Sequence, residues 1–254
     1  MLDKLKYEVL DRPLTLAKTH DYCFSGRPKV TVVLVHGIAS NSGTFAGLLK
    51  YLEGTQTMRD VRFVTFDWLG AGESYKSEKL RYDFKEQILA LHNSITKLDA
   101  DGPVVLLGHS MGTLIATRYA DQHRRMVKRL ILVSPPIYRP EDFDNPLFKQ
   151  GIEGFRKAIT LKNREMVGDK AFENEMKLII CNRKNYEVLL RVARPTRLIY
   201  GELDEIIARF NISGVVKANP LITAAKTPGQ HGVTPDKYGK VLEVLEEEVA
   251  DATV

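Results

Sequence analysis

The sequence has 254 residues, of which 44% are hydrophobic and 27% are charged. This length fits one α/β domain with a large core, and the ordinary composition argues against a disordered or fibrous chain. The net charge of +5 is mildly basic, and its densest run, residues 123–129, falls where a helix is expected to end, so we expect no nucleic-acid partner.

The first residues and the two cysteines carry no targeting or cross-linking pattern. Residues 1–7 lack the apolar centre of a signal peptide, and no stretch is apolar for long enough to span a membrane. Cys23 and Cys181 lie far apart without metal or redox spacing, as is typical of free thiols in a reducing compartment. We therefore expect a cytoplasmic protein that holds no metal or other cofactor.

The first third of the chain contains short edge segments and then two strong strand signals. Residues 7–10 and 14–17 are apolar runs that fit edge strands. Residues 30–35 are rich in β-branched residues, which predicts a strand buried on both faces, and residues 61–66 are expected to form the next strand. The second strand runs into a glycine-rich segment that begins at Asp67, and we expect this carboxylate to organise the glycine turn.

Those glycines do not form a dinucleotide-binding motif. Gly70 and Gly72 match its first two glycines, but Tyr75 stands where the third glycine is required. A helix is predicted over residues 84–98, because its apolar residues recur with helical spacing.

The most informative stretch lies at residues 104–116. An apolar run stops at Gly108-His109-Ser110-Met111-Gly112, and a helical pattern of small residues follows at once. Strand, sharp turn and helix in this order are the context of a nucleophile elbow, in which strain lifts the hydroxyl of Ser110 clear of the sheet. The amide of Met111 opens the helix and can donate to an oxyanion in the same space. We therefore predict that Ser110 is a nucleophile and not part of a plain tight turn.

The alternation of strands and helices stops between residues 137 and 194, where amphipathic helical stretches replace it. Phe148, Ile152, Phe155 and Ile159 share one helical face. The alternation is expected to resume with a strand at 195–200, a helix at 206–217 and a strand at 221–225. A last helix is expected to begin at Thr234-Pro235. The patterns predict an α/β fold with a mostly parallel central sheet flanked by helices and interrupted by a helical insertion.

The Gly-x-Ser-x-Gly pentapeptide, with its flanking segments, resembles the α/β-hydrolase superfamily of serine esterases, lipases and related acyl hydrolases, and the similarity runs over most of the chain. The resemblance implies one catalytic domain, with a first core part at 1–136, a helical lid at 137–194 and a second core part at 195–254. It also implies an acyl transfer to water.

Further residues take their expected roles from this resemblance. Asp204 follows Gly201 at a strand end, where the family has its triad acid, and His231 lies in the loop where the family has its catalytic histidine. The order Ser110, Asp204, His231 is that of the family. Ile38, after a His-Gly pair, would supply the second oxyanion amide beside that of Met111.

Neighbouring residues are expected to be decoys or structural groups. His36 is a structural histidine in the family, while Glu202 and Glu205 flank the expected acid without replacing it. Gln230 stands where many relatives have a second glycine, so a bulkier neighbour of His231 would narrow the pocket.

The expected substrate is a small molecule, a carboxylic ester with a small or medium apolar acyl group. Trp68, Phe148 and Phe155 are the expected substrate-binding residues. Thioester, lactone, amide and carbon–carbon bond hydrolysis remain alternatives, since the same fold hosts them all with one triad. A non-catalytic ligand receptor is the alternative from another class. The oligomeric state is not predicted.

Overall fold

The computed structural model describes residues 14–99, 102–159 and 166–251, so the edge strand expected at 7–10 lies outside the described residues. Within them, seven strands form one sheet in the order β1-β3-β2-β4-β5-β6-β7. β1 pairs with β3 antiparallel, and the five remaining pairings are parallel. The strands are β1 (Ala17–Tyr22), β2 (Val30–Val35), β3 (Val61–Asp67), β4 (Val104–His109), β5 (Val127–Val133), β6 (Thr196–Gly201) and β7 (Ile222–Thr227).

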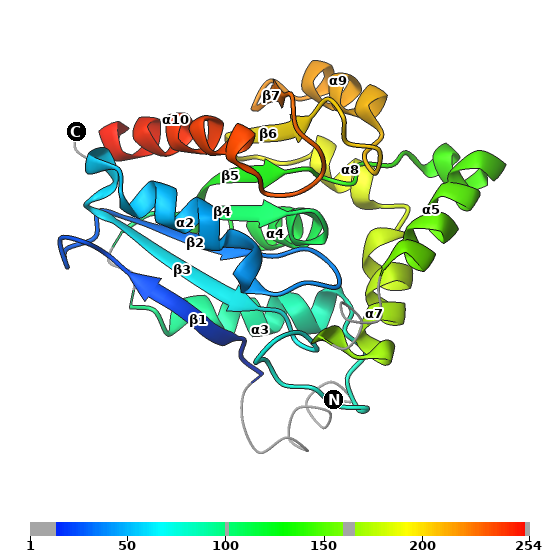
Figure 1. Cartoon of the computed structure of the whole chain (residues 1–254), viewed down its shortest axis with the longest axis horizontal. Coiled ribbons are helices and arrows are strands. Elements are labelled where there is room, and N and C mark those ends of the chain that lie inside the picture. Colours follow the sequence, from blue (N-terminus) through cyan, green and yellow to red (C-terminus); the bar gives the residue numbers. More distant parts are fainter. Residues whose placement is uncertain (1–13, 100–101, 160–165, 252–254) are drawn as a thin grey trace.

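Helices cover both faces of the sheet, as Figure 1 shows. Val32 and Leu34 of β2 pack against α2 (Ala46–Glu53) and α10 (Pro235–Asp251). Val33 and Val35 belong to the core on the other face, with α3 (Phe84–Thr96) and α4 (Met111–Gln122). Because successive residues of a strand point to opposite faces, a strand covered on both sides is apolar throughout. The predicted α/β class and the mostly parallel sheet are confirmed.

The segment between β5 and β6 is helical, as predicted. Figure 1 shows α5 and α7 standing beyond the carboxyl ends of the parallel strands. This region consists of a short turn of helix (Pro140–Asp144), α5 (Pro146–Ala158), α7 (Asp169–Glu175) with a π-helical turn (Met176–Ile180), and α8 (Asn185–Leu190). α9 (Arg209–Ala218) then lies between β6 and β7.

Most element boundaries lie within two residues of the sequence-based expectation, but two elements begin later than expected. The first described strand begins at Ala17 and not at Leu14, because this edge strand is half exposed and its apolar signal is weak. The helix expected from Ile206 begins at Arg209. The Asp204 carboxylate accepts the amide hydrogens of Ile206 and Ile207, at 3.0 and 3.4 Å, which replaces the first helical turn with a local side-chain turn.

None of the helices in the described part of the chain combines the length and the apolarity needed to cross a bilayer. The expected cytoplasmic location stays a prediction.

The elbow depends on a close approach between α4 and β2, which gives a test of the fold. A Cβ on Gly112 would lie 2.4 Å from the carbonyl oxygen of Val35 and 2.6 Å from that of His36. We expect Gly112→Ala to lower the free energy of unfolding by about 2 kcal/mol or more, since rigid backbone must shift. Gly239, inside α10, has open space around it, so Gly239→Ala is the matched control and should stabilise by about 0.5–1 kcal/mol. Urea unfolding of both variants measures this, and equal stability of the two would contradict the close approach.

Candidate active site

Ser110 occupies the junction of β4 and α4 with φ of +50° and ψ of −121°. A serine adopts such a conformation only when its surroundings enforce it. Its amide donates to the carbonyl of Val133 at 3.0 Å, and its carbonyl accepts the amide and the hydroxyl of Thr113 at 2.9 and 2.6 Å. Both peptide groups of the turn are therefore fixed, and the predicted elbow geometry is present.

Of the three residues expected to form a triad, Ser110 and Asp204 each lie within hydrogen-bond distance of His231. Ser110 Oγ lies 2.9 Å from Nε2 of His231. Nδ1 of His231 lies 2.9 Å and 3.1 Å from the two carboxylate oxygens of Asp204. In this arrangement Nδ1–H donates to the carboxylate and leaves Nε2 to accept the serine proton. The residues come from the loops after β4, β6 and β7, which meet at the carboxyl edge of the parallel strands.

The carboxylate of Asp204 is completely buried, yet it is held in its charged form. Burial raises its pKa, but the hydrogen bond and the charge of His231 and the amide of Ile206 together outweigh this, and the pKa lies below its usual value. An ionised acid that faces Nδ1 fixes the tautomer of the imidazole and favours an imidazolium when one forms.

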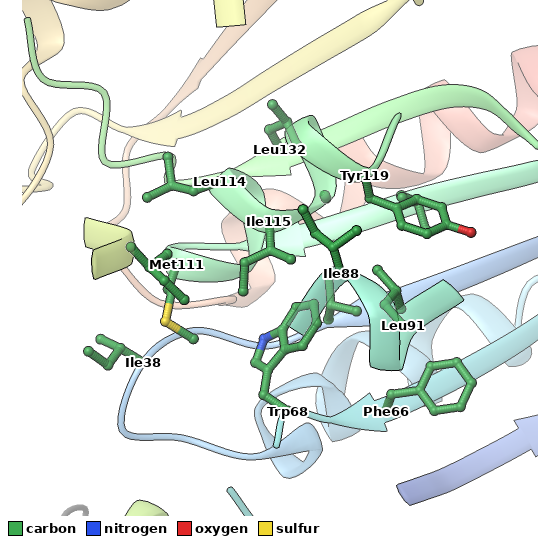
Figure 2. Close-up of a cluster of buried hydrophobic side chains, with 14 of the residues drawn as sticks. Ile38, Phe66, Trp68, Ile88, Leu91, Met111, Leu114, Ile115, Tyr119 and Leu132 are labelled. Atoms are coloured by element: carbon green, nitrogen blue, oxygen red, sulfur yellow. The ribbon is translucent and has the colours of Figure 1, made fainter. Parts of the chain in front are cut away.

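The two residues whose backbone amides are expected to bind an oxyanion lie close to Ser110 in the chain or in space. Met111 is the first residue of α4, so its N–H has no acceptor within the helix and lies at the positive end of the helix dipole. The loop after β2 approaches from the other side, since a Cβ on Gly37 would lie 3.0 Å from Cβ of Ser110. Figure 2 shows Ile38, the next residue, beside Met111. The role of these two amides as oxyanion donors stays a prediction.

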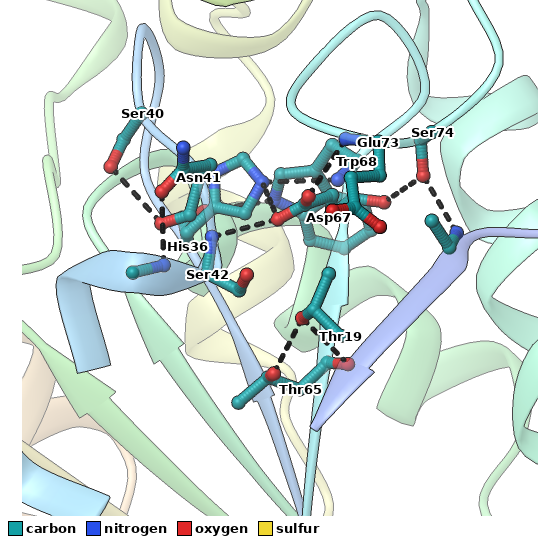
Figure 3. Close-up of polar contacts among 12 residues, drawn as sticks. Thr19, His36, Ser40, Asn41, Ser42, Thr65, Asp67, Trp68, Glu73 and Ser74 are labelled. Atoms are coloured by element: carbon teal, nitrogen blue, oxygen red, sulfur yellow. Dashed lines mark hydrogen bonds and ion pairs between the residues drawn. The ribbon is translucent and has the colours of Figure 1, made fainter. Parts of the chain in front are cut away.

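A polar network holds the loop after β2, residues 36–42, against the loop after β3, as Figure 3 shows. One carboxylate oxygen of Asp67 accepts the amide of Ser42 at 2.7 Å, and the other accepts that of Glu73 at 3.0 Å. Nε2 of His36 accepts the amide of Trp68 at 3.0 Å, and its Nδ1 donates to the carbonyl of Gly37 at 2.8 Å. Asp67 and His36 therefore both bind backbone groups of these loops, as expected of structural residues.

A cavity of about 560 Å³ opens beside Ser110. Phe148 and Phe155 of α5 line it, as expected from the sequence. Trp68 does not, and the expectation for this residue is wrong: its side chain is fully buried, and its indole N–H donates to the carbonyl of His36 at 2.8 Å. Figure 2 shows the indole beside Ile88 in the core. The loop after β3 turns this residue inward, where its one polar atom finds a partner.

Sequence reasoning missed a second histidine beside the site. Nε2 of His109 donates to the backbone carbonyl of His231 at 3.0 Å. The ring is buried, and burial, with the nearby charge of His231, lowers its pKa to about 3. Burial likewise lowers the pKa of His36 to about 4. No periodic pattern marks His109, because its partner is more than a hundred residues away in the chain.

A model of the α/β hydrolase fold family matches residues 30–172. Among curated proteins, the probable lysophospholipase BODYGUARD 5 of Arabidopsis thaliana is 30% identical over 119 residues, which are 46% of this chain and 27% of that protein. The monoglyceride lipase of Mus musculus is 30% identical over 114 residues, 44% of this chain and 36% of that protein. The matched segments thus span well under half the length of these relatives.

Solved structures match over nearly the whole chain. An esterase from Exiguobacterium antarcticum superposes with a TM-score of 0.68 at 19% identity, and the match covers 91% of this chain and 94% of the esterase chain. The monoacylglycerol lipase of Paleococcus ferrophilus has a TM-score of 0.63 at 20% identity, with coverages of 93% and 99%. At these identities the likeness concerns the fold.

The two buried histidines make stability depend on pH. Their pKa values fall from 6.5 in the unfolded chain to about 4 for His36 and about 3 for His109, so below pH 6.5 the unfolded state binds protons that the folded state does not. Their contribution is complete above pH 6.5 and is lost as the pH falls toward those values, at about 1.4 kcal/mol per pH unit for each histidine. Urea unfolding between pH 7 and 4.5 should therefore give a shallower decline for His109→Gln than for the wild type. Parallel curves would contradict the shifted pKa of His109.

Proposed function

The chain belongs to the α/β-hydrolase family, and from this premise we propose that the protein is a serine hydrolase that cleaves a carboxylic ester with a small or medium apolar acyl group. The observation that carries the proposal is the hydrogen-bonded series from Asp204 through His231 to Ser110. Ser110, at the end of this series, lines a mainly apolar cavity. A ligand receptor has no need of this aligned and strained arrangement. The relatives named as lipases and esterases support the same reaction class.

The geometry supports an acyl-enzyme mechanism. Nε2 of His231 takes the hydroxyl proton as Oγ of Ser110 attacks the ester carbonyl carbon. The amides of Ile38 and Met111 then hold the oxyanion of the tetrahedral intermediate. The imidazolium, stabilised by Asp204, gives its proton to the departing alcohol. A water molecule then attacks the acyl carbon while His231 takes its proton, and the return of this proton to Oγ of Ser110 releases the acid.

The lining of the cavity supports a neutral, apolar substrate. Phe148, Phe155 and Ile206 supply apolar contact, and Tyr138 uses its hydroxyl to donate to the carbonyl of Ile206 at 2.7 Å. Among the described lining residues, Glu205 is the one carboxylate, and no basic side chain is present to pair with an anionic acyl group. Because α5 contributes part of this lining, the helical segment at 137–194 would act as a lid between the two core parts at 1–136 and 195–254.

The reaction can be tested with three variants and a panel of acyl esters of graded length. We expect kcat to fall by about 10⁶-fold in Ser110→Ala, because the nucleophile is lost. Asp204→Asn should cost about 10⁴-fold, since the histidine takes the wrong tautomer. Glu202→Gln is the matched control, because Glu202 pairs with Lys226 at 3.0 Å on the surface, and it should retain near wild-type rates.

Two results would contradict the assignment. Ester turnover in Ser110→Ala close to that of the wild type would show that Ser110 is not the nucleophile. A larger loss of activity in Glu202→Gln than in Asp204→Asn would show that Asp204 is not the triad acid. If thioesters, lactones or amides were hydrolysed with the same dependence on Ser110 while esters were not, the triad would stand and the proposed bond class would fail.

The aromatic residues of α5 give a separate test of substrate class. Each methylene group that loses burial costs roughly 0.8 kcal/mol, or about fourfold in binding. We therefore expect Phe148→Ala and Phe155→Ala to change the ratio of kcat/KM between a medium and a short acyl ester. Leu221→Ala serves as the control, since Leu221 is also partly exposed and lies outside the cavity lining. An unchanged ratio with a lower melting temperature would mean that the two residues only pack α5 against the body.

A further inference from the structure

The loop between β7 and α10 carries His231, and two buried donors outside the proposed triad bind its backbone. Nζ of Lys237, in the first turn of α10, donates to the carbonyl of Gln230 at 2.7 Å. Nε2 of His109, the last residue of β4, donates to the carbonyl of His231 at 3.0 Å. Both side chains are buried, and the ring of His109 lies 5.2 Å from that of His231, measured between ring centroids.

We propose that Lys237 and His109 are positioning residues that orient the imidazole of His231 by holding the two carbonyls on either side of its Cα. The proposal rests on the proposed function, in which His231 is the general base. Gln230 has the bulkier side chain expected to narrow the pocket, but it is its backbone carbonyl that takes part here.

The two acceptors are special because they belong to consecutive peptide planes. The carbonyl of Gln230 lies in the plane that precedes Cα of His231, and the carbonyl of His231 lies in the plane that follows it. Peptide units are rigid, so the chain can rotate only at φ and ψ between them. Two donors that fix both planes therefore fix the direction of the Cα–Cβ bond of His231. The hydrogen bonds to Asp204 then need to settle only the side-chain torsions.

Lys237 is unusual in being completely buried. Lysine is almost never fully buried unless it is paired, because its charge loses hydration. Its three N–H groups meet three acceptors: the carbonyl of Gln230, Oγ1 of Thr234 at 3.2 Å and Oδ2 of Asp236 at 3.3 Å. The whole donor capacity of the ammonium group is used within one loop and the helix start that follows it.

Asp236 connects this lysine to the beginning of the same loop. Its Oδ2 accepts the amide of Gly229 at 3.1 Å and the hydroxyl of Thr227 at 2.7 Å. Burial raises its pKa, but hydrogen bonds from Thr234 and Thr227 and the charge of Lys237 bring it to about 2, so the carboxylate stays charged beside the lysine. Thr227, Gly229 and Gln230 are thus each bound to the first turn of α10.

His109 ties the same loop to the nucleophile, because it immediately precedes Ser110. A donor one residue away from the attacking oxygen couples the backbone of the base to the backbone of the elbow. Within the described residues, its Nδ1 is buried without a hydrogen-bond partner, so the bond from Nε2 is the polar contact that accounts for a histidine at this position. The strand that carries it is central and buried, which makes the donor rigid.

The test compares removal and retention of each donor. His109→Leu and Lys237→Met delete a donor and keep apolar bulk, while His109→Gln places an amide N–H near the position of Nε2. Lys240→Met is the matched control on α10, since Lys240 is half exposed and pairs with Glu243 at 2.7 Å. For each protein, kcat and KM are measured on a chromogenic acyl ester, with folded active sites counted by a fluorophosphonate and the melting temperature recorded.

We expect kcat per counted site to fall by about 10- to 100-fold in His109→Leu and Lys237→Met, with KM changed less than threefold, because a displaced base affects the transition state more than substrate binding. His109→Gln should restore kcat to within about threefold of the wild-type value. The control Lys240→Met should have the wild-type kcat. If Lys237→Met does not fold, the comparison of Leu and Gln at position 109 still decides.

The proposal is overturned if kcat per site stays at the wild-type value in His109→Leu while the melting temperature falls, or if Gln and Leu at position 109 lower kcat equally. A wild-type protein that neither hydrolyses the ester nor reacts with the fluorophosphonate would instead overturn the proposed function, and this inference with it. If the wild type turns over the ester normally and the variants keep its kcat per site, the positioning role is contradicted and the proposed function stands.

Discussion

The strained turn at Ser110 is the constraint on which the carboxyl edge of the sheet depends. A non-glycine residue with φ of +50° persists only when neighbouring groups fix both of its peptide planes, and β5 and the first turn of α4 do this. The price is tight spacing: the helix start must lie against the backbone of β2, which only a residue without a side chain permits at position 112. The same close approach brings the loop after β2 to Ser110, since a Cβ on Gly37 would lie 3.0 Å from Cβ of Ser110.

The loops that surround this turn are held by buried polar side chains that bind their backbone. Asp67 and His36 fix the loop after β2, Asp204 caps the turn before α9, and Lys237 fixes the loop of His231. Buried polar atoms destabilise a fold unless they are hydrogen-bonded, so this density of charged and imidazole groups needs a function to account for it. Orienting short catalytic loops at the ends of a rigid sheet is such a function, and it joins the fold to the chemistry proposed here.

The elements and the role of Ser110 could be predicted because their signals are local, whereas Asp204 and His231 were identified through the resemblance to the α/β-hydrolase family. The run before Ser110, the glycines beside it and the strand ends before Asp204 and His231 can each be recognised within about ten residues of sequence. The expectation for Trp68 follows from the family, in which its loop neighbours the oxyanion side, but only the tertiary packing decides that its ring turns into the core. The supporting groups His109 and Lys237 depend on where distant or irregular segments meet, and hydrophobic periodicity contains no signal for that.

The central claim is that Ser110 is a nucleophile activated by His231, and covalent labelling tests it most directly. The wild-type protein is incubated with a fluorophosphonate, its intact mass is measured, and the modified peptide is mapped. The account predicts one adduct per chain, on the peptide that contains Ser110, with no adduct in Ser110→Ala and strongly slowed labelling in His231→Ala. No adduct on the folded wild-type protein, or an adduct that persists in Ser110→Ala, would contradict it.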